Sequence, residues 1–323
     1  MRAMILAAGL GTRLLPLTNC RPKALVPLRT VTMLQFWIER LSQCGFESVC
    51  LNAFHRKQCL GAAVGLKKWP LPVKVLYEPL LLGTAGGIRL GAEHGGDTPL
   101  AVVNADVLSN ADLGLLYQRH RLSGAGVSLL LHDCPQFNNV AVGIDGFVLG
   151  FGKEAKQICK KDHHIRLLAF TGIHFLNSSV LAGIPPGVAC DIIQVYRELI
   201  AKNDPPAALF QQDLFWREMG SIQSYRKLTL ELAKLPASFL APIITGQTLT
   251  IARQARIHPS CRLEGSVVIS PGVVAGEGVS LENVIIWDNV HIEKGSYLKN
   301  CIVTDGMKIF GRHTGKIFAP EPM

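Results

Sequence analysis

The 323-residue sequence lacks a long apolar run, although hydrophobic residues make up 48% of it and charged residues only 18%. A helix that crosses a membrane needs about 18 or more consecutive apolar residues, and the uncharged apolar runs here are much shorter. We therefore expect no membrane span and no membrane partner. The apolar content suffices for large buried cores, which excludes a mainly disordered chain, and the length favours two domains.

The cysteine spacing of a disulfide framework or a structural zinc site is also absent. The nine cysteines are scattered, odd in number and contain no Cys-x-x-Cys pair. The ten histidines form no metal-binding pattern, and no Ser/His/Asp or Cys/His arrangement stands out. These absences favour a reducing compartment, and we expect a cytoplasmic protein.

Acidic residues are missing from the first part of the chain, where Glu39 is the first one. Five cations precede it, and the net charge of the whole chain is +9. Such a segment suits the recognition of phosphate groups. Composition does not separate a nucleotide from a nucleic acid, so a basic surface with general affinity for polyanions stays open as an alternative.

Apolar runs alternate with amphipathic stretches through about residue 230. Runs of Val, Leu and Ile predict strands covered on both faces, and the stretches between them have helical periodicity. We predict strands at 2–8, 48–52, 73–77, 100–104, 126–131 and 169–176, and helices at 33–44, 86–94, 111–122 and 191–202. This alternation is typical of an α/β fold with a Rossmann-like, mostly parallel sheet sandwiched by helices.

The pattern changes after a segment at 236–246 that contains proline and glycine. From Ile251 to Val303, aliphatic or bulky residues recur every six positions on two tracks. A period of six fits neither a helix nor an alternating strand, and it is typical of short parallel strands stacked in coils. We predict an α/β domain at 1–235, a linker at 236–246 and a short left-handed parallel β-helix at 247–323.

Two glycines follow the first predicted strand, within LAAGLGTRL at residues 6–14. Glycine allows backbone N–H groups to approach an anion closely, without an intervening side chain. A dinucleotide-binding fingerprint would need glycine in place of Leu14, and a Walker P-loop would need a Gly-Lys pair followed by Ser or Thr. A simple turn would explain the two glycines but not the placement of Arg13 and Lys23.

The sequence GLGTRLLPLT at 9–18, followed by PKALVP at 22–27, resembles the signature of the nucleotide-sugar pyrophosphorylases, or sugar-1-phosphate nucleotidyltransferases. The resemblance implies that the glycine loop wraps a nucleoside triphosphate and that Arg13 and Lys23 meet the phosphates of the nucleotide and the sugar. Fixed cations are needed there because two phosphate-bearing substrates repel each other. The implied nucleotide-binding residues in this segment are Leu6, Ala8, Gly9, Gly11, Thr12 and Arg13.

Two carboxylates lie where this family places its metal ligands. LAVVNAD at 100–106 is an apolar strand that ends in Asp106, and WREMGS at 216–221 resembles the family's W-x-D-x-G-T with Glu218 in place of aspartate. The resemblance implies that Asp106 and Glu218 hold Mg²⁺, which prefers carboxylate oxygens together with substrate phosphates. The extra methylene of Glu218 puts the metal placement or the rate in question. From its pattern alone, Asp106 also fits a turn or a helix cap.

YEPLLLGTAGG at 77–87 resembles the family's base-recognition loop. Thymidylyl- and uridylyltransferases carry glutamine five residues before the loop glycine, whereas Glu78 stands five before Gly83 here. A carboxylate can accept both donors of the guanine edge, and it would repel the carbonyls of uracil or thymine. We therefore expect Glu78, Gly83 and Thr84 to bind a guanine nucleotide. A solvent-facing Glu78 is the alternative, and uridylyltransferases share similar sequences.

The sugar-binding residues are less clearly marked. FGKEA at 151–155 has the family's Glu-Lys pair inverted and lacks its proline. We expect Asn139, Lys153, Glu154 and Thr171 to contact sugar hydroxyls, although each also fits a turn or surface position.

The resemblance implies Mg²⁺-dependent conversion of a nucleoside triphosphate and a sugar 1-phosphate into a nucleotide sugar and pyrophosphate. The catalytic residues would be Arg13, Lys23 and Asp106, and the favoured substrates are GTP and mannose 1-phosphate. Uridylyl or thymidylyl transfer to another sugar 1-phosphate, a non-catalytic regulatory homologue and an added acyltransferase site in the repeats are alternatives. We expect no nucleic-acid partner and a homo-oligomer formed through the β-helix.

Overall fold

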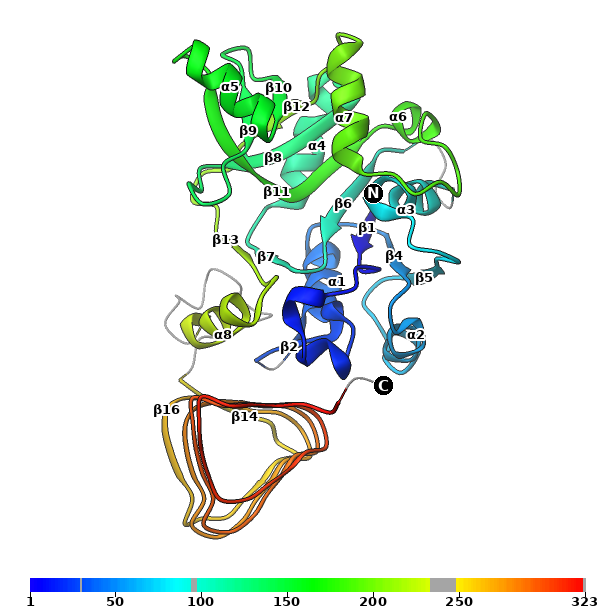
Figure 1. The fold of residues 1–323 in the computed structure, drawn as a ribbon. Helices are drawn as coiled ribbons and strands as arrows, with labels where there is room; N and C mark the ends of the chain where they lie inside the picture. The colour runs from blue at the N-terminus through cyan, green and yellow to red at the C-terminus, as the bar shows by residue number, and fades with distance from the viewer. Residues whose placement is uncertain (30, 94–97, 233–247, 322–323) are drawn as a thin grey trace. The chain divides into compact units, whose positions relative to one another are not determined.

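The computed structural model describes residues 1–29, 31–93, 98–232 and 248–321 (Figure 1). The chain divides into two compact units, one formed by Met1–Gly9 and Trp37–Trp216 and the other by Leu10–Phe36 and Arg217–Met323. Most of the phosphate-binding signature therefore belongs to the same unit as the C-terminal repeats. The predicted linker at 236–246 lies outside the described residues.

The first unit contains a nine-stranded sheet. Its strands are β1 (Arg2–Leu6), β4 (Ser48–Ala53), β5 (Val73–Tyr77), β6 (Leu100–Asn104), β8 (Val127–His132), β9 (Val140–Val142), β10 (Val148–Phe151), β11 (Arg166–Leu176) and β12 (Ala207–Leu209). The main order is β10-β9-β11-β6-β1-β4-β5, with β8 on β11 and β12 on β8.

The core of this sheet is parallel, as the sequence predicts. Strand β1 pairs in parallel with β4 and β6, and β4 pairs in parallel with β5. The sheet becomes mixed beyond β6, because β11 is antiparallel to β6, β8 and β9. The register of β11 against β8 breaks between Phe170 and His174, and Gly172 in this break has a φ of +78°. A glycine accommodates such a bulge without strain.

Helices pack on this sheet and complete the core of the first unit. Helix α3 packs against β1 and β4, α5 against β9, β10 and β11, and α7 against β10. The buried core between these elements includes Met4, Ile88, Val102, Leu129 and Tyr196. The helices are α1 (Met33–Gln43), which crosses the boundary between the units, α2 (Lys57–Gly65), α3 (Gly83–Ala92), α4 (Leu113–Ser123), α5 (Lys153–Lys161), α6 (Ser178–Ala182) and α7 (Ile192–Ala201). None of the helices in the described ranges is long and apolar enough to cross a membrane.

The second unit begins with three single-turn 3₁₀-helices, η1 (Thr12–Leu14), η2 (Leu17–Asn19) and η3 (Lys23–Leu25). Further short elements are β2 (Pro27–Leu28), β3 (Val31–Thr32) and α8 (Ile222–Glu231). Two strands outside the large sheet are β7 (Val107–Ser109) in the first unit and β13 (Trp216–Glu218) at the boundary.

Residues 249–318 form the strand stack, a series of three-sided coils in Figure 1 whose ladders are all parallel. Its strands are β14 (Leu249–Ile251), β15 (Arg256–Ile257), β16 (Arg262–Ile269), β17 (Val274–Ala275), β18 (Ser280–Ile286), β19 (His291–Ile292), β20 (Tyr297–Lys299), β21 (Ile302–Val303), β22 (Lys308–Ile309), β23 (Arg312–Thr314) and β24 (Ile317–Phe318). This arrangement is compatible with the predicted β-helix.

The coils of the strand stack shorten along the chain. Ile251 pairs with Ile269, eighteen residues on, whereas Val274 pairs with His291, seventeen residues on. The register shifts between β16 and β18, so the strict period of six ends there. Ile292 and Leu298 are consequently buried in the core of the stack, where the sequence pattern predicts the residues that precede them.

Candidate active site

The signature segment, residues 9–27, belongs to the second unit from Leu10 onwards and folds around Gly11, which has a φ of +64° at the start of η1. A β-carbon at this position would lie 2.8 Å from a methyl group of Thr18 and 3.6 Å from the β-carbon of Lys23. The hydroxyl of the buried Thr18 donates a hydrogen bond to the carbonyl of Gly11 at 3.1 Å. The glycine therefore allows the turn that carries Lys23 to pack against the loop, while the side chains of Thr12 and Arg13 are exposed.

Two predicted functional residues of this unit contact each other directly. Arg13 Nη2 donates to Glu218 Oε1 at 2.9 Å. Gly220 is next to this ion pair, and a side chain there would overlap both partners. Ser221, where the family has threonine, caps α8 by accepting from the backbone N–H of Ser224 at 3.1 Å. The WREMGS motif therefore places Glu218 beside Arg13 and begins the helix that follows.

In the first unit, the predicted nucleotide-binding residues Leu6, Ala8 and Gly9 lie at the carboxyl end of β1. Asn52 on the neighbouring strand β4 accepts from the backbone N–H of Ala7 through its Oδ1, at 2.7 Å. Asp106 follows β6, which is the other neighbour of β1. The carboxyl ends of these parallel strands therefore bring Asp106 to the same edge of the sheet as the start of the glycine loop.

Glu78, the predicted base-reading residue, is only 1% exposed. Its Oε1 accepts from Asn52 Nδ2 at 2.7 Å, and its Oε2 accepts from the backbone N–H of Leu82 at 3.0 Å. A side chain at Gly87 would collide with both Asn52 and Glu78. Glu78 thus does not face solvent; it connects β4 to the loop before α3. Its contact with a base stays a prediction.

Asn52 was not predicted as a site residue, and its side chain joins the end of β1 to Glu78. An asparagine in the middle of an apolar strand, 3% exposed, is the signal that could have revealed it. A buried amide needs partners for all of its polar atoms.

Gly83 and Thr84 connect the predicted base loop to α7. Gly83 has a φ of +68°, and a side chain there would collide with the carbonyl of Cys190. Thr84 Oγ1 accepts from the backbone N–H of Ile192 at 2.8 Å, and both Gly83 and Thr84 are exposed. The loop is therefore attached at its base to the start of α7, with these two residues at the surface.

Three of the predicted sugar-binding residues lie close together. The backbone N–H of Gly152 donates to the carbonyl of Asn139 at 2.7 Å, which brings Asn139 next to Lys153 and Glu154 in the first turn of α5. The side chains of all three are exposed. The helix itself was not predicted, since Ala155 is its only buried residue among those described.

Thr171, the fourth predicted sugar contact, is 1% exposed and bonded within the protein. Its Oγ1 donates to the carbonyl of Leu130 at 2.7 Å, and its carbonyl accepts from Trp216 Nε1 at 2.8 Å. Trp216 also packs against the rings of His132 and Phe137, with centroids 4.9 and 5.4 Å away. This aromatic group, which the sequence analysis missed, lies beside β8 and β11; Thr171 as a sugar contact stays a prediction.

The residues predicted to hold a metal fit a hard divalent cation by their chemistry. Asp106 and Glu218 offer carboxylate oxygens, and the missing side chain of Gly220 is what allows Glu218 Oε1 to occupy its position beside Arg13. In the described ranges of the chain, no group of three or more His, Cys, Asp or Glu residues could hold a metal ion by itself. Two carboxylates suit an ion that takes its remaining ligands from substrate phosphates and water.

Comparison with known proteins identifies the family. A family model described as nucleotidyl transferase matches residues 2–234, and one described as GMPPB C-terminal domain matches residues 245–313. The mannose-1-phosphate guanylyltransferase of Mycobacterium tuberculosis is 27% identical over 310 residues, which cover 92% of this chain and 82% of that protein. The UTP–glucose-1-phosphate uridylyltransferase of Synechocystis sp. is 25% identical over 329 residues, which cover 96% and 77%.

The fold also has a solved counterpart. The crystal structure of HddC from Yersinia pseudotuberculosis matches with a TM-score of 0.57 at 19% identity, covering 71% of this chain and 97% of that one. At this identity the match supports the fold alone. The family model covers most of the chain, and the resemblance carried by residues 9–27 is confirmed. The chain therefore belongs to the nucleotidyl transferase family and is a nucleotidyltransferase of the nucleotide-sugar pyrophosphorylase type.

Proposed function

We propose that this protein transfers the guanylyl group of GTP to mannose 1-phosphate, forming GDP-mannose and releasing pyrophosphate. The observation that carries the proposal is the signature segment, in which Arg13 and the turn of Lys23 are held around Gly11. Support for guanine and mannose comes from relatives that carry the name mannose-1-phosphate guanylyltransferase.

In this proposal an oxygen of mannose 1-phosphate attacks the α-phosphorus of GTP, and pyrophosphate leaves on the opposite side. Arg13 binds the departing phosphates, and Lys23 binds the reacting ones. Leu6, Ala8, Gly9, Gly11 and Thr12 surround the triphosphate with backbone groups. Catalysis rests on positioning and on neutralising the charge that builds up in the transition state.

Asp106 and Glu218 are the residues that would hold Mg²⁺. When bound, a divalent cation neutralises phosphate charge and withdraws electrons from phosphorus. The ion pair with Arg13 orients the carboxylate of Glu218. Asn139, Lys153, Glu154 and Thr171 are the proposed sugar contacts, and Glu78, Gly83 and Thr84 the proposed contacts on the side of the base.

Uridylyl transfer is the second candidate, because one relative is named UTP–glucose-1-phosphate uridylyltransferase. Because Glu78 is held by Asn52 and by the backbone N–H of Leu82, the surrounding loop also takes part in the choice of base. The exposed apolar side chains of Tyr77, Leu80 and Leu81 at the end of β5 offer a surface on which either base could stack. A non-catalytic regulatory homologue is disfavoured, since Arg13, Lys23 and Asp106 are all present.

The domain organisation, the oligomeric state and the location of the protein are also part of the proposal. In the proposed organisation, the catalytic domain extends over 1–235 and the linker over 236–246. Residues 247–323, which include the strand stack, form a left-handed β-helix through which the chain forms homo-oligomers. The nine cysteines, all of which lie in the described ranges, form no disulfide, which supports a cytoplasmic location.

Pyrophosphate release tests the proposal. Each combination of GTP, UTP or dTTP with a set of sugar 1-phosphates is assayed with Mg²⁺. The highest turnover is expected with GTP and mannose 1-phosphate, and release equal to that of a Lys23→Met control in every combination would refute the proposal.

A further inference from the structure

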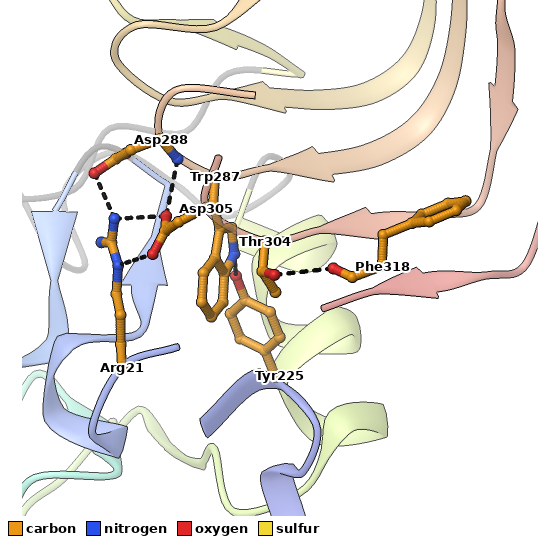
Figure 2. Close-up of polar contacts among 7 residues, drawn as sticks. All are labelled: Arg21, Tyr225, Trp287, Asp288, Thr304, Asp305 and Phe318. Carbon is orange, nitrogen blue, oxygen red and sulfur yellow. Dashed lines mark hydrogen bonds and ion pairs between the residues drawn. The ribbon is translucent and has the colours of Figure 1, made fainter. Parts of the chain in front are cut away.

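Arg21 precedes Lys23 by two residues, and its side chain reaches the strand stack (Figure 2). Its guanidinium binds Asp305 through two bonds, Nε to Oδ2 at 2.6 Å and Nη2 to Oδ1 at 2.7 Å. Nη2 also donates to Asp288 Oδ2 at 2.5 Å. We call these three residues the Arg21 bridge. It joins the signature segment to two turns of the strand stack that are far away in sequence.

The Arg21 bridge is partly shielded from water. The side chain of Arg21 is 20% exposed, and those of Asp288 and Asp305 are about 30% exposed. Burial alone would lower the pKa of Arg21, but the hydrogen bonds and charges of the two aspartates outweigh it and raise that pKa. Arg21 also lies over the ring of Trp287, 5.6 Å from its centroid. A planar, doubly bound guanidinium has little freedom to turn.

The turn that carries Asp305 is itself fixed by the strand stack. Thr304 donates to the carbonyl of Phe318 through both its backbone N–H and its Oγ1, each at 2.9 Å (Figure 2). Asp305 Oδ1 additionally accepts from the backbone N–H of Asp288 at 3.1 Å. Hydrogen bonds therefore hold the turn of Asp305, which accepts from Arg21, to the coil before it and to the coil after it.

A second connection lies at the other end of the Lys23 turn. The hydroxyl of Tyr225 donates to the carbonyl of Pro27 at 2.9 Å and accepts from Trp287 Nε1 at 3.0 Å. Tyr225 and Trp287 are fully buried. Trp287 and Asp288 are consecutive, so one turn of the strand stack is connected to the chain on both sides of Lys23. Asp288 binds Arg21 directly, and Trp287 is linked to Pro27 through Tyr225.

We propose that Arg21 is a positioning residue, through which Asp288, Asp305 and Trp287 of the strand stack fix the turn that presents the Lys23 ammonium to the reacting phosphates. The inference rests on the role of Lys23 in the proposed function and deepens it. The strand stack then contributes to the reaction as the anchor of the phosphate-binding segment.

The test uses the full chain with Asp305→Asn, which keeps the side-chain shape and weakens the bridge. Asp288→Asn, which alters a single bond, serves if Asp305→Asn does not fold. The matched control is Glu282→Gln, which weakens another carboxylate pair of the stack, to Lys299 at 2.8 Å, that does not involve the signature segment. Two readouts are compared, kcat for pyrophosphate release and hydrogen exchange of the peptide that spans residues 19–27.

Asp305→Asn is expected to lower kcat about 10- to 100-fold, the effect of a small misplacement of a reacting group, and to accelerate exchange in the 19–27 peptide. Glu282→Gln should change neither. In a Lys23→Met background, Asp305→Asn should cause little further loss, because residues that act through each other are not additive.

Unchanged exchange in the 19–27 peptide, or full additivity with Lys23→Met, would overturn the inference. If the wild-type chain releases no pyrophosphate with any substrate pair, the proposed function fails. The exchange comparison still decides whether the Arg21 bridge holds this segment.

Discussion

Arg13 Nη2 lies 2.9 Å from Glu218 Oε1, so the predicted phosphate-binding cation and the predicted metal-binding carboxylate are paired with each other. The side chain of Arg13 is 67% exposed and that of Glu218 is 16% exposed. A pair with one partner in solvent contributes at most about 1 kcal/mol to stability. The consequence of this pair is geometric, because it holds side by side two groups that the proposed complex of phosphate and metal would need.

Glu218→Gln removes the charge of this carboxylate and keeps its length. We expect kcat to fall about 100-fold, equivalent to about 3 kcal/mol of transition-state stabilisation, and the Mg²⁺ concentration for half-maximal activity to rise. Titration of activity with Mg²⁺ measures both effects. An unchanged titration curve would show that Glu218 is no metal ligand.

Lys23→Met removes the ammonium and keeps most of the side-chain volume. Loss of one fixed charge at a reacting phosphate should lower kcat about 10²- to 10³-fold with the melting temperature unchanged. Lys227→Met is the matched control, since Lys227 is 75% exposed on α8. Equal activity of the two variants would remove Lys23 from the catalytic residues.

Glu78→Gln tests the buried carboxylate. Asn52 Nδ2 and the N–H of Leu82 both donate to Glu78, and glutamine offers only one acceptor oxygen. An unpaired buried donor costs about 1–3 kcal/mol, so we expect a lower urea midpoint. Because Glu78 is proposed to contact the base, the relative loss of activity should be largest with GTP. An equal relative loss with every nucleoside triphosphate would show that Glu78 holds its loop and does not read the base.

The free energy of unfolding should decrease as the pH is lowered below about 6.5, the ordinary pKa of histidine. Burial lowers the pKa of His174 to about 3. Above pH 6.5 the imidazole is neutral in both states; below it, only the unfolded chain binds a proton. The free energy of unfolding therefore decreases by about 1.4 kcal/mol per pH unit towards pH 3.

Urea unfolding of the wild type and His174→Gln between pH 7 and pH 5 measures this contribution. The variant should have the shallower dependence. Burial also lowers the pKa of His120, so the difference between the two slopes, rather than the wild-type slope, is the test. Parallel slopes would show that His174 does not contribute.

Local patterns in the sequence were sufficient to predict the strands β1, β4, β5 and β6 and the signature segment. Buried parallel strands have apolar runs, and the loops that bind phosphate need glycine, so both can be recognised from a short stretch of sequence. The parallel stacking of the C-terminal strands was visible for the same reason, because a repeated coil repeats its inward-facing residues.

The contacts that join distant segments have no such local sequence pattern. Arg21 and Asp305 are 284 positions apart, and neither side chain is unusual in its own surroundings. The burial of Glu78 depends on Asn52, which the pairing of β4 with β5 brings beside it. The change from 18 to 17 residues per coil was missed because the pattern was extended at a constant period of six, which places His291 and Tyr297 where Ile292 and Leu298 are buried.

The central claim is that the signature segment binds a nucleoside triphosphate for transfer to a sugar phosphate. The most direct measurement is pyrophosphate release with Mg²⁺, compared between the wild type and Lys23→Met over a matrix of nucleoside triphosphates and sugar 1-phosphates. The account predicts release by the wild type that is highest with GTP and mannose 1-phosphate and at least about 100-fold lower in the variant. Equal release by the two proteins with every substrate pair would contradict it.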